Sequence, residues 1–199
     1  MKKIVRCLVL TLQLCLAVVW ISSAGELESQ LMDAAINGNT NNARTLIEKG
    51  ANINAKNQSD GTTALIFAAN NGHLDTVKLL IEKGADVNAY DKYGRTALMR
   101  AADYVGHIEV IKFLIDKGAN IEAKDEYGNT ALMQAVNSAK NVNAVRTLIE
   151  KGANVNAKDK MGYTVLWNSE NIIPNPDNVG EAARRKEISQ ILRKAGARR

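Results

Sequence analysis

With 199 residues, 46% of them hydrophobic and 24% charged, the chain has the size and composition of a folded protein of one or two domains. Aromatic residues make up only 5%, so a core must be built mainly from Leu, Ile, Val and Ala. The net charge of +5 does not indicate nucleic-acid binding, because it comes from the two ends: residues 25–183 contain 16 basic and 20 acidic side chains, and seven basic side chains gather in residues 184–199.

The first 24 residues have the layout of a secretory signal peptide. A basic start over residues 2–6 precedes a mostly apolar run over 8–21 and three small residues at 22–24. We expect cleavage between Ala24 and Gly25. The alternative is a retained anchor, which would make the protein a membrane-attached adaptor. The apolar run is shorter than the roughly 20 residues that a spanning helix needs, which favours cleavage.

The expected location is outside the cytoplasm. The short basic start and a sequence rich in Lys and Asn are typical of bacterial proteins, so we expect the mature protein in the periplasm or, as second choice, secreted. Cys7 and Cys15, the only cysteines, both lie in the signal. Cleavage would therefore leave no disulfide framework and no Cys-ligated metal site. Membrane contact is expected only through an uncleaved signal.

A unit of 34 residues repeats through the rest of the chain. The pair Gly-Ala recurs at this spacing at Gly50-Ala51, Gly84-Ala85, Gly118-Ala119 and Gly152-Ala153. A fifth pair, Gly196-Ala197, follows after 44 residues. Apolar residues at helical spacing before each pair predict a helix, as with Leu74, Val77, Leu80 and Ile81. The glycine then ends that helix, because a left-handed cap costs glycine little.

A turn and a second, shorter helix complete each unit. An extended Asp/Asn–Val/Ile–Asn–Ala stretch leads into a turn that contains a glycine, and a threonine follows two residues later. Each threonine can cap a helix through its hydroxyl: Thr63, Thr96, Thr130 and Thr164. Small residues such as Ala101 and Ala102 in these helices let neighbouring units approach closely.

These segments together resemble the ankyrin repeat. The resemblance rests on Thr63-Ala64-Leu65, Ala68-Ala69, Gly72-His73, Leu79-Leu80-Ile81 and Gly84-Ala85-Asp86-Val87-Asn88-Ala89. It covers nearly all of one domain over residues 25–199, in five units near 26–56, 57–90, 91–124, 125–158 and 159–199. It implies an all-α repeat solenoid in which each unit is a helix–turn–helix with a β-hairpin finger.

The units depart from the family pattern at several places. Unit 2 has one extra residue in its turn, and units 3 and 4 have one extra between their helices, near Val105 and Ala139. Unit 4 has Lys140-Asn141 where other units have Gly-His. Unit 5 carries an insertion over residues 171–180, which is either a ligand-contacting loop or a tolerated extension.

The sequence predicts a protein without enzymatic activity. His73 and His107, the only histidines, occupy the same Gly-His position, where the resemblance implies a hydrogen bond between repeats. A metal site would need further convergent ligands, and no nucleophile–base pair can be identified. We therefore expect no catalytic residue, no metal and no cofactor. A small metal-binding protein or enzyme is the weaker alternative.

Two groups of residues are candidates for contact with a protein partner. The first consists of tyrosines in fingers or in loops between helices, where the resemblance implies partner contacts: Tyr90, Tyr93, Tyr104, Tyr127 and Tyr163. The second is a row on the first helix of each unit with its polar neighbours: Phe67, Arg100, Gln134 and Asn168, with Arg95, Asp103, Glu126 and Asn129. We expect a monomer that binds another protein through this concave face and the fingers. Tyrosines that are simply half exposed in loops are the alternative.

Overall fold

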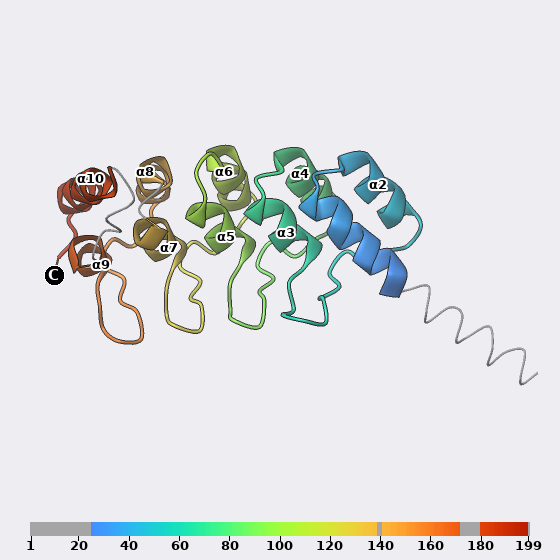
Figure 1. Cartoon of the computed structure of the whole chain (residues 1–199), viewed down its shortest axis with the longest axis horizontal. Coiled ribbons are helices and arrows are strands. Elements are labelled where there is room, and N and C mark those ends of the chain that lie inside the picture. The colour runs from blue at the N-terminus through green and yellow to red at the C-terminus, as the bar shows by residue number, and fades with distance from the viewer. Residues whose placement is uncertain (1–24, 139–140, 172–179, 199) are drawn as a thin grey trace, which may run out of the picture.

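The computed structural model describes residues 25–138, 141–171 and 180–198, and their helices form two rows along an elongated stack (Figure 1). The first row holds the helix over residues 25–36, α3 (Ala64–Asn70), α5 (Ala97–Asp103), α7 (Ala131–Ser138) and α9 (Val165–Asn171). The second row holds α2 (Thr40–Glu48), α4 (Leu74–Glu82), α6 (Ile108–Asp116), α8 (Val142–Glu150) and α10 (Glu181–Lys194). This pairing confirms the predicted all-α solenoid of about five units. The expected signal peptide lies outside the described residues.

Unit 3 shows how the sequence forms each helix pair. Thr96 precedes α5, and its hydroxyl oxygen accepts a hydrogen bond from the Met99 backbone N–H at 3.4 Å. The predicted caps at the other threonines make the same bond. At the end of the pair, Gly118 has a φ of 89°, the left-handed conformation that ends α6. The threonine cap and the glycine at the helix end therefore set the length of each unit.

The core lies between the two helix rows and runs from unit to unit. Leu80 and Leu114 are completely buried, with 0% of their surface accessible to solvent, as their helical spacing predicts. The first-row helices contribute mainly small buried residues, such as Ala101 and Ala102 of α5. Since α5 packs against both α3 and α7, each alanine face lets the next unit come close. Burial of these rows is the main source of stability in such a stack.

Two of the residues that precede second-row helices join neighbouring units. His73 Nε2 lies 2.9 Å from the carbonyl oxygen of Ile36 in unit 1, which is the predicted bond between repeats. In unit 4, Asn141 occupies the equivalent position, and its Nδ2 donates to the carbonyl oxygen of Tyr104 at 2.6 Å. The asparagine therefore replaces the histidine in the bond between units. The extra residue expected near Ala139 lies outside the described residues.

The fingers are turns whose strand pairing is limited to isolated bridges. Within the described residues, these bridges join Tyr90 to Thr96 and Lys158 to Thr164, so the expected β-hairpins are reduced to single pairs. Backbone bonds instead join one finger to the next: Lys160 N–H donates to the carbonyl of Tyr127 at 2.9 Å. A Cβ on Gly128 would lie 2.7 Å from the Lys160 nitrogen, which explains why glycine occupies this turn.

The last unit ends the stack with the longest helix of the described region, α10. Ile188 and Leu192 are buried on its inner side. The basic tail seen in the sequence is only partly free: Arg185 is buried and pairs with Glu181 at 2.7 Å. Most of the 171–180 insertion lies outside the described residues. In the part of the chain that the structure describes, no helix is both long enough and apolar enough to cross a membrane.

Candidate partner-binding surface

The fingers and the exposed side of the first-row helices form one continuous side of the stack, which we call the finger face (Figure 1). Its fingers span residues 56–63, 90–96, 124–130 and 158–164. Equivalent residues of successive units lie beside one another, because backbone bonds join neighbouring fingers. Side chains with the same position in the repeat therefore form rows across several units.

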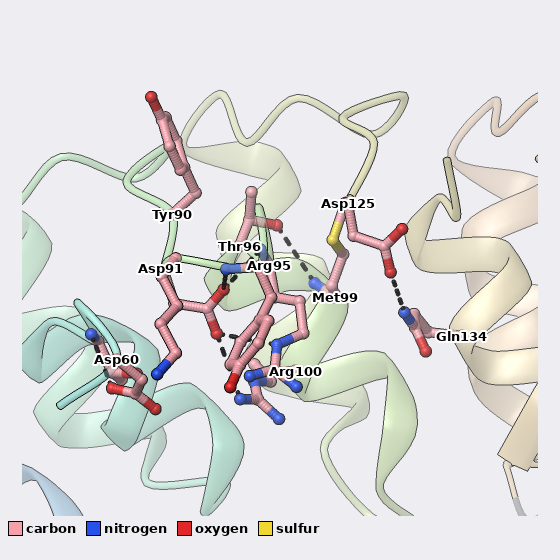
Figure 2. Close-up of polar contacts among 12 residues, drawn as sticks. Asp60, Tyr90, Asp91, Arg95, Thr96, Met99, Arg100, Asp125 and Gln134 are labelled. Atoms are coloured by element: carbon pink, nitrogen blue, oxygen red, sulfur yellow. Dashed lines mark hydrogen bonds and ion pairs between the residues drawn. The ribbon is translucent and has the colours of Figure 1, made fainter. Parts of the chain in front are cut away.

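A buried aspartate supports the finger of unit 3. Asp91 is 1% exposed, and its Oδ1 accepts hydrogen bonds from the backbone N–H groups of Tyr93 and Arg95, both at 2.9 Å. Its Oδ2 accepts from Arg95 Nε at 2.8 Å and from Arg100 Nη2 at 3.3 Å (Figure 2). The carboxylate thus fixes the turn from inside and holds two guanidinium groups beside it.

Unit 4 meets the same need with neutral side chains. Asp125 Oδ1 accepts from the N–H groups of Tyr127 at 2.9 Å and Asn129 at 2.8 Å. Its Oδ2 accepts from Asn129 Nδ2 at 3.3 Å. It also accepts from Gln134 Nε2 at 2.8 Å, the bond that Figure 2 shows. Asn129 and Gln134 therefore stand where unit 3 has Arg95 and Arg100.

These contacts show that several of the predicted polar residues also support buried groups. The Arg100 side chain is 23% exposed and is tied to Asp91, so truncating it affects the finger as well as any partner. Asn129 likewise both lies on the finger and donates to the buried Asp125 carboxylate. Asn168, expected on the same row, is buried and is not available for contact. Sequence spacing placed these residues on one row but gave no sign of the buried carboxylates.

The predicted tyrosines fall into two classes. Tyr90 and Tyr127 are 58% and 65% exposed, and Tyr104 is also exposed, in the loop between α5 and α6. Figure 2 shows Tyr90 pointing away from the polar cluster below it. Tyr93 is half-buried, with the Arg95 guanidinium carbon 4.4 Å from the centre of its ring. Tyr163 is also half-buried, because its ring stacks on another aromatic ring.

Met161 is an exposed apolar residue that the sequence interpretation missed. It is 77% exposed at the tip of the last finger. Its position is equivalent to Tyr127 one unit earlier and to Tyr93 two units earlier, so the 34-residue spacing contained the signal. Large side chains thus occupy this tip position in three consecutive fingers.

A groove separates the fingers of units 3 and 4. It has a volume of about 390 Å³ and is lined by Asn88, Tyr90, Gly94, Thr96, Asn120, Ala123 and Lys124. Of the remaining predicted contacts, Glu126 is exposed on the unit 4 finger and Asp103 is half-buried at the end of α5. Tyr90 is the predicted contact that borders the groove, which gives this residue a defined neighbourhood on the finger face.

The electrostatic surroundings change the pKa of few groups on this face. A hydrogen bond from Tyr127 to Glu126, followed by the Glu126 charge, raises the pKa of the Tyr127 hydroxyl. Hydrogen bonding to Thr62 lowers the pKa of the Asp60 carboxyl in the unit 2 finger. Both changes strengthen a group's ordinary protonation state at neutral pH. Neither change brings a group closer to titrating at neutral pH.

The histidine position has a structural role. The His107 ring lies against Gly72, where a Cβ would approach it to 2.4 Å, and stacks on Tyr104 with 5.9 Å between ring centres. Burial, followed by the charge of His73, lowers the pKa of His107. Among the residues that the structure describes, no group of three or more His, Cys, Asp or Glu side chains is placed to hold a metal ion.

Comparison with known protein families matches most of the repeat region. A family model described as ankyrin repeats (3 copies) matches residues 31–125. A second model, described as ankyrin repeats (many copies), matches residues 114–166. Together the two models span residues 31–166, well over half of the chain. A search of curated proteins gave no match.

Proposed function

Because the chain belongs to the ankyrin-repeat family, whose members are generally protein–protein interaction modules, we propose that it binds another protein through its finger face. The observation that carries the proposal is the set of large, exposed side chains on the fingers. Tyr90, Tyr127 and Met161 are the strongest examples. Exposed aromatic and methionine side chains on a rigid scaffold are typical of interface centres.

We propose no catalytic role for the finger face. The polar groups of the finger face are engaged with turns and caps, as Asp91 and Asp125 illustrate. A binding module needs only a shaped surface that remains folded without its partner. The stacked units supply such a surface, because each finger is fixed to its neighbour by backbone hydrogen bonds.

We further propose that the mature protein works outside the cytoplasm, in the periplasm or as a secreted protein. The basic start, apolar run and small residues of the first 24 positions support export and cleavage after Ala24. N-terminal sequencing of the protein from its native host tests this location. A mature chain that starts at Gly25 supports it, whereas an intact Met1 in the membrane fraction would favour the anchored adaptor.

Cross-linking in the native host tests the binding function itself. The partner would be captured with the protein by affinity purification, and cross-linked peptides would then be identified by mass spectrometry. We expect cross-links from Lys92, Lys124 and Lys160 of the fingers. Cross-links restricted to Lys78 and Lys112 on second-row helices would place the partner on the opposite side and reject the finger face.

A further inference from the structure

Units 3 and 4 stabilise the same buried carboxylate in two different ways. In unit 4, the amide groups of Asn129 and Gln134 donate to Asp125 Oδ2. In unit 3, the guanidinium groups of Arg95 and Arg100 donate to Asp91 Oδ2. The repeat therefore shows that a neutral pair is enough to support the finger. The two arginines exceed this structural need.

The arginines leave an excess of positive charge on the finger face. Two guanidinium groups share one carboxylate, so this cluster has a net charge of +1, whereas the matching cluster in unit 4 has a net charge of −1. Lys92 lies nearby, with its Nζ 5.0 Å from the centre of the Tyr93 ring, but its charge is offset by the Asp60 carboxylate of the preceding finger, so the excess charge comes from the two arginines. The local field therefore favours an anionic group at unit 3.

The two guanidinium groups are also held in place before any ligand arrives. Asp91 fixes Arg95 from one side, and the Tyr93 ring lies 4.4 Å from its guanidinium carbon. Arg100 makes one long hydrogen bond at 3.3 Å, and its Nε is buried without a hydrogen-bond partner. Each guanidinium group has five N–H donors, and only one from each is used by Asp91. Preorganised donors bind with a smaller entropy loss.

We propose that Arg95 and Arg100 bind the carboxylate of an Asp or Glu side chain in an exposed segment of the partner protein. This inference rests on the proposed function and names the partner's chemistry at unit 3. A guanidinium fork matches a carboxylate through paired N–H···O bonds. An extended polyanion fits less well, because residues 25–183 contain more acidic than basic side chains and Glu126 lies in the next finger.

The repeat itself supplies the matched variant for a test. The double substitution R95N/R100Q copies the side chains of unit 4 into unit 3, which removes two charges and keeps donors for Asp91. A phage-displayed library of random twelve-residue peptides is selected against the unchanged full chain. The selected peptides are then synthesised, and their dissociation constants are measured by fluorescence anisotropy. K78Q/K112Q, which removes two charges from second-row helices, is the control.

We expect the selected peptides to be enriched in Asp and Glu. They should bind R95N/R100Q about tenfold more weakly than the unchanged protein, as loss of charged hydrogen bonds predicts, and bind K78Q/K112Q normally. Replacing their Asp and Glu by Asn and Gln should weaken binding to the unchanged protein but hardly affect binding to R95N/R100Q. Circular dichroism checks the fold. If the double variant is misfolded, R100Q alone is expected to show a smaller loss in the same direction.

Two results would overturn this inference in different ways. Peptides that bind the unchanged protein and R95N/R100Q equally would reject the carboxylate site while leaving the finger face as a binding surface. Failure to select any peptide would reject this inference, whereas the cross-linking experiment decides the proposed function separately. Displacement of the peptides by inorganic phosphate, without any preference for Asp or Glu, would identify a phosphate site instead and also contradict the proposal.

Discussion

The residue that precedes a second-row helix can perform two tasks, and in α2, α4 and α8 its side chain decides how many it performs. Asn39 caps α2 by accepting a hydrogen bond from Asn42 N–H at 3.0 Å. His73 bonds to the preceding unit and makes no side-chain cap. Asn141 does both, because its amide group has a donor and an acceptor: it caps α8 through Ala144 N–H at 3.1 Å and donates to the carbonyl of Tyr104.

Removing these two asparagines should therefore have unequal effects. Asn39→Ala removes a cap alone and should lower the free energy of unfolding by about 1 kcal/mol. Asn141→Ala also leaves the Tyr104 carbonyl without its donor and should cost about 2 kcal/mol or more. Urea denaturation of the two variants measures the difference. Equal losses would show that the Asn141–Tyr104 bond contributes nothing to stability.

His107 should make the stability depend on pH in mildly acidic solution. Burial and the neighbouring His73 lower the pKa of His107 in the folded state below its ordinary value of 6.5. The unfolded chain therefore takes up this proton at a higher pH than the folded chain does. Protonation favours unfolding, so the His107 contribution is complete above about pH 6.5 and is lost as the pH falls from that value through the lower pKa of the folded state.

The variant His107→Asn isolates this effect, because asparagine already occupies the equivalent position in unit 4. Free energies of unfolding would be measured by urea denaturation between about pH 5 and pH 8. The unchanged protein should lose more stability than the variant on acidification. Parallel pH profiles would mean that His107 keeps an ordinary pKa in the folded protein.

At the scale of helices and fingers, apolar spacing explains most of what the sequence could predict. The residues at helical spacing before each Gly-Ala pair are those buried between units, as Leu80 and Leu114 show. The threonine caps and the glycine helix ends could be predicted from the sequence, because each depends on one residue type in one local conformation. The sequence did not predict that the fingers lack full hairpins, because the aspartate side chains and the neighbouring finger take hydrogen bonds that a hairpin would otherwise form.

Shortening a leucine in the row between units should test the register of the repeat. Leu80→Ala and Leu114→Ala each leave a cavity in a fully buried site and should cost about 2–5 kcal/mol. Ile36→Ala, at an exposed apolar position, should cost much less. Denaturant unfolding compares the three variants. A loss below about 1 kcal/mol at both leucines would contradict the packing described above.

At the scale of the whole molecule, the candidate surface was only partly predictable. The 34-residue spacing placed the tyrosines and the Arg100 row on one side, since equivalent residues of a stack must align. It could not separate exposed residues such as Tyr127 from residues engaged with buried groups such as Arg100. That distinction depends on Asp91, which is polar in sequence and buried in the structure. Which side chains are exposed on the finger face can therefore be decided only from the three-dimensional structure.

The most direct test of the finger face is titration of its captured partner against surface variants by calorimetry. Tyr90→Ala and Tyr127→Ala remove exposed side chains without disturbing the core, so each should weaken binding by about 1 kcal/mol or more. Their stability should change by less than about 0.5 kcal/mol, which thermal unfolding verifies. Lys78→Ala and Lys112→Ala on second-row helices should bind normally. Normal binding by both tyrosine variants, with loss of binding by the lysine variants, would contradict the finger face as the binding surface.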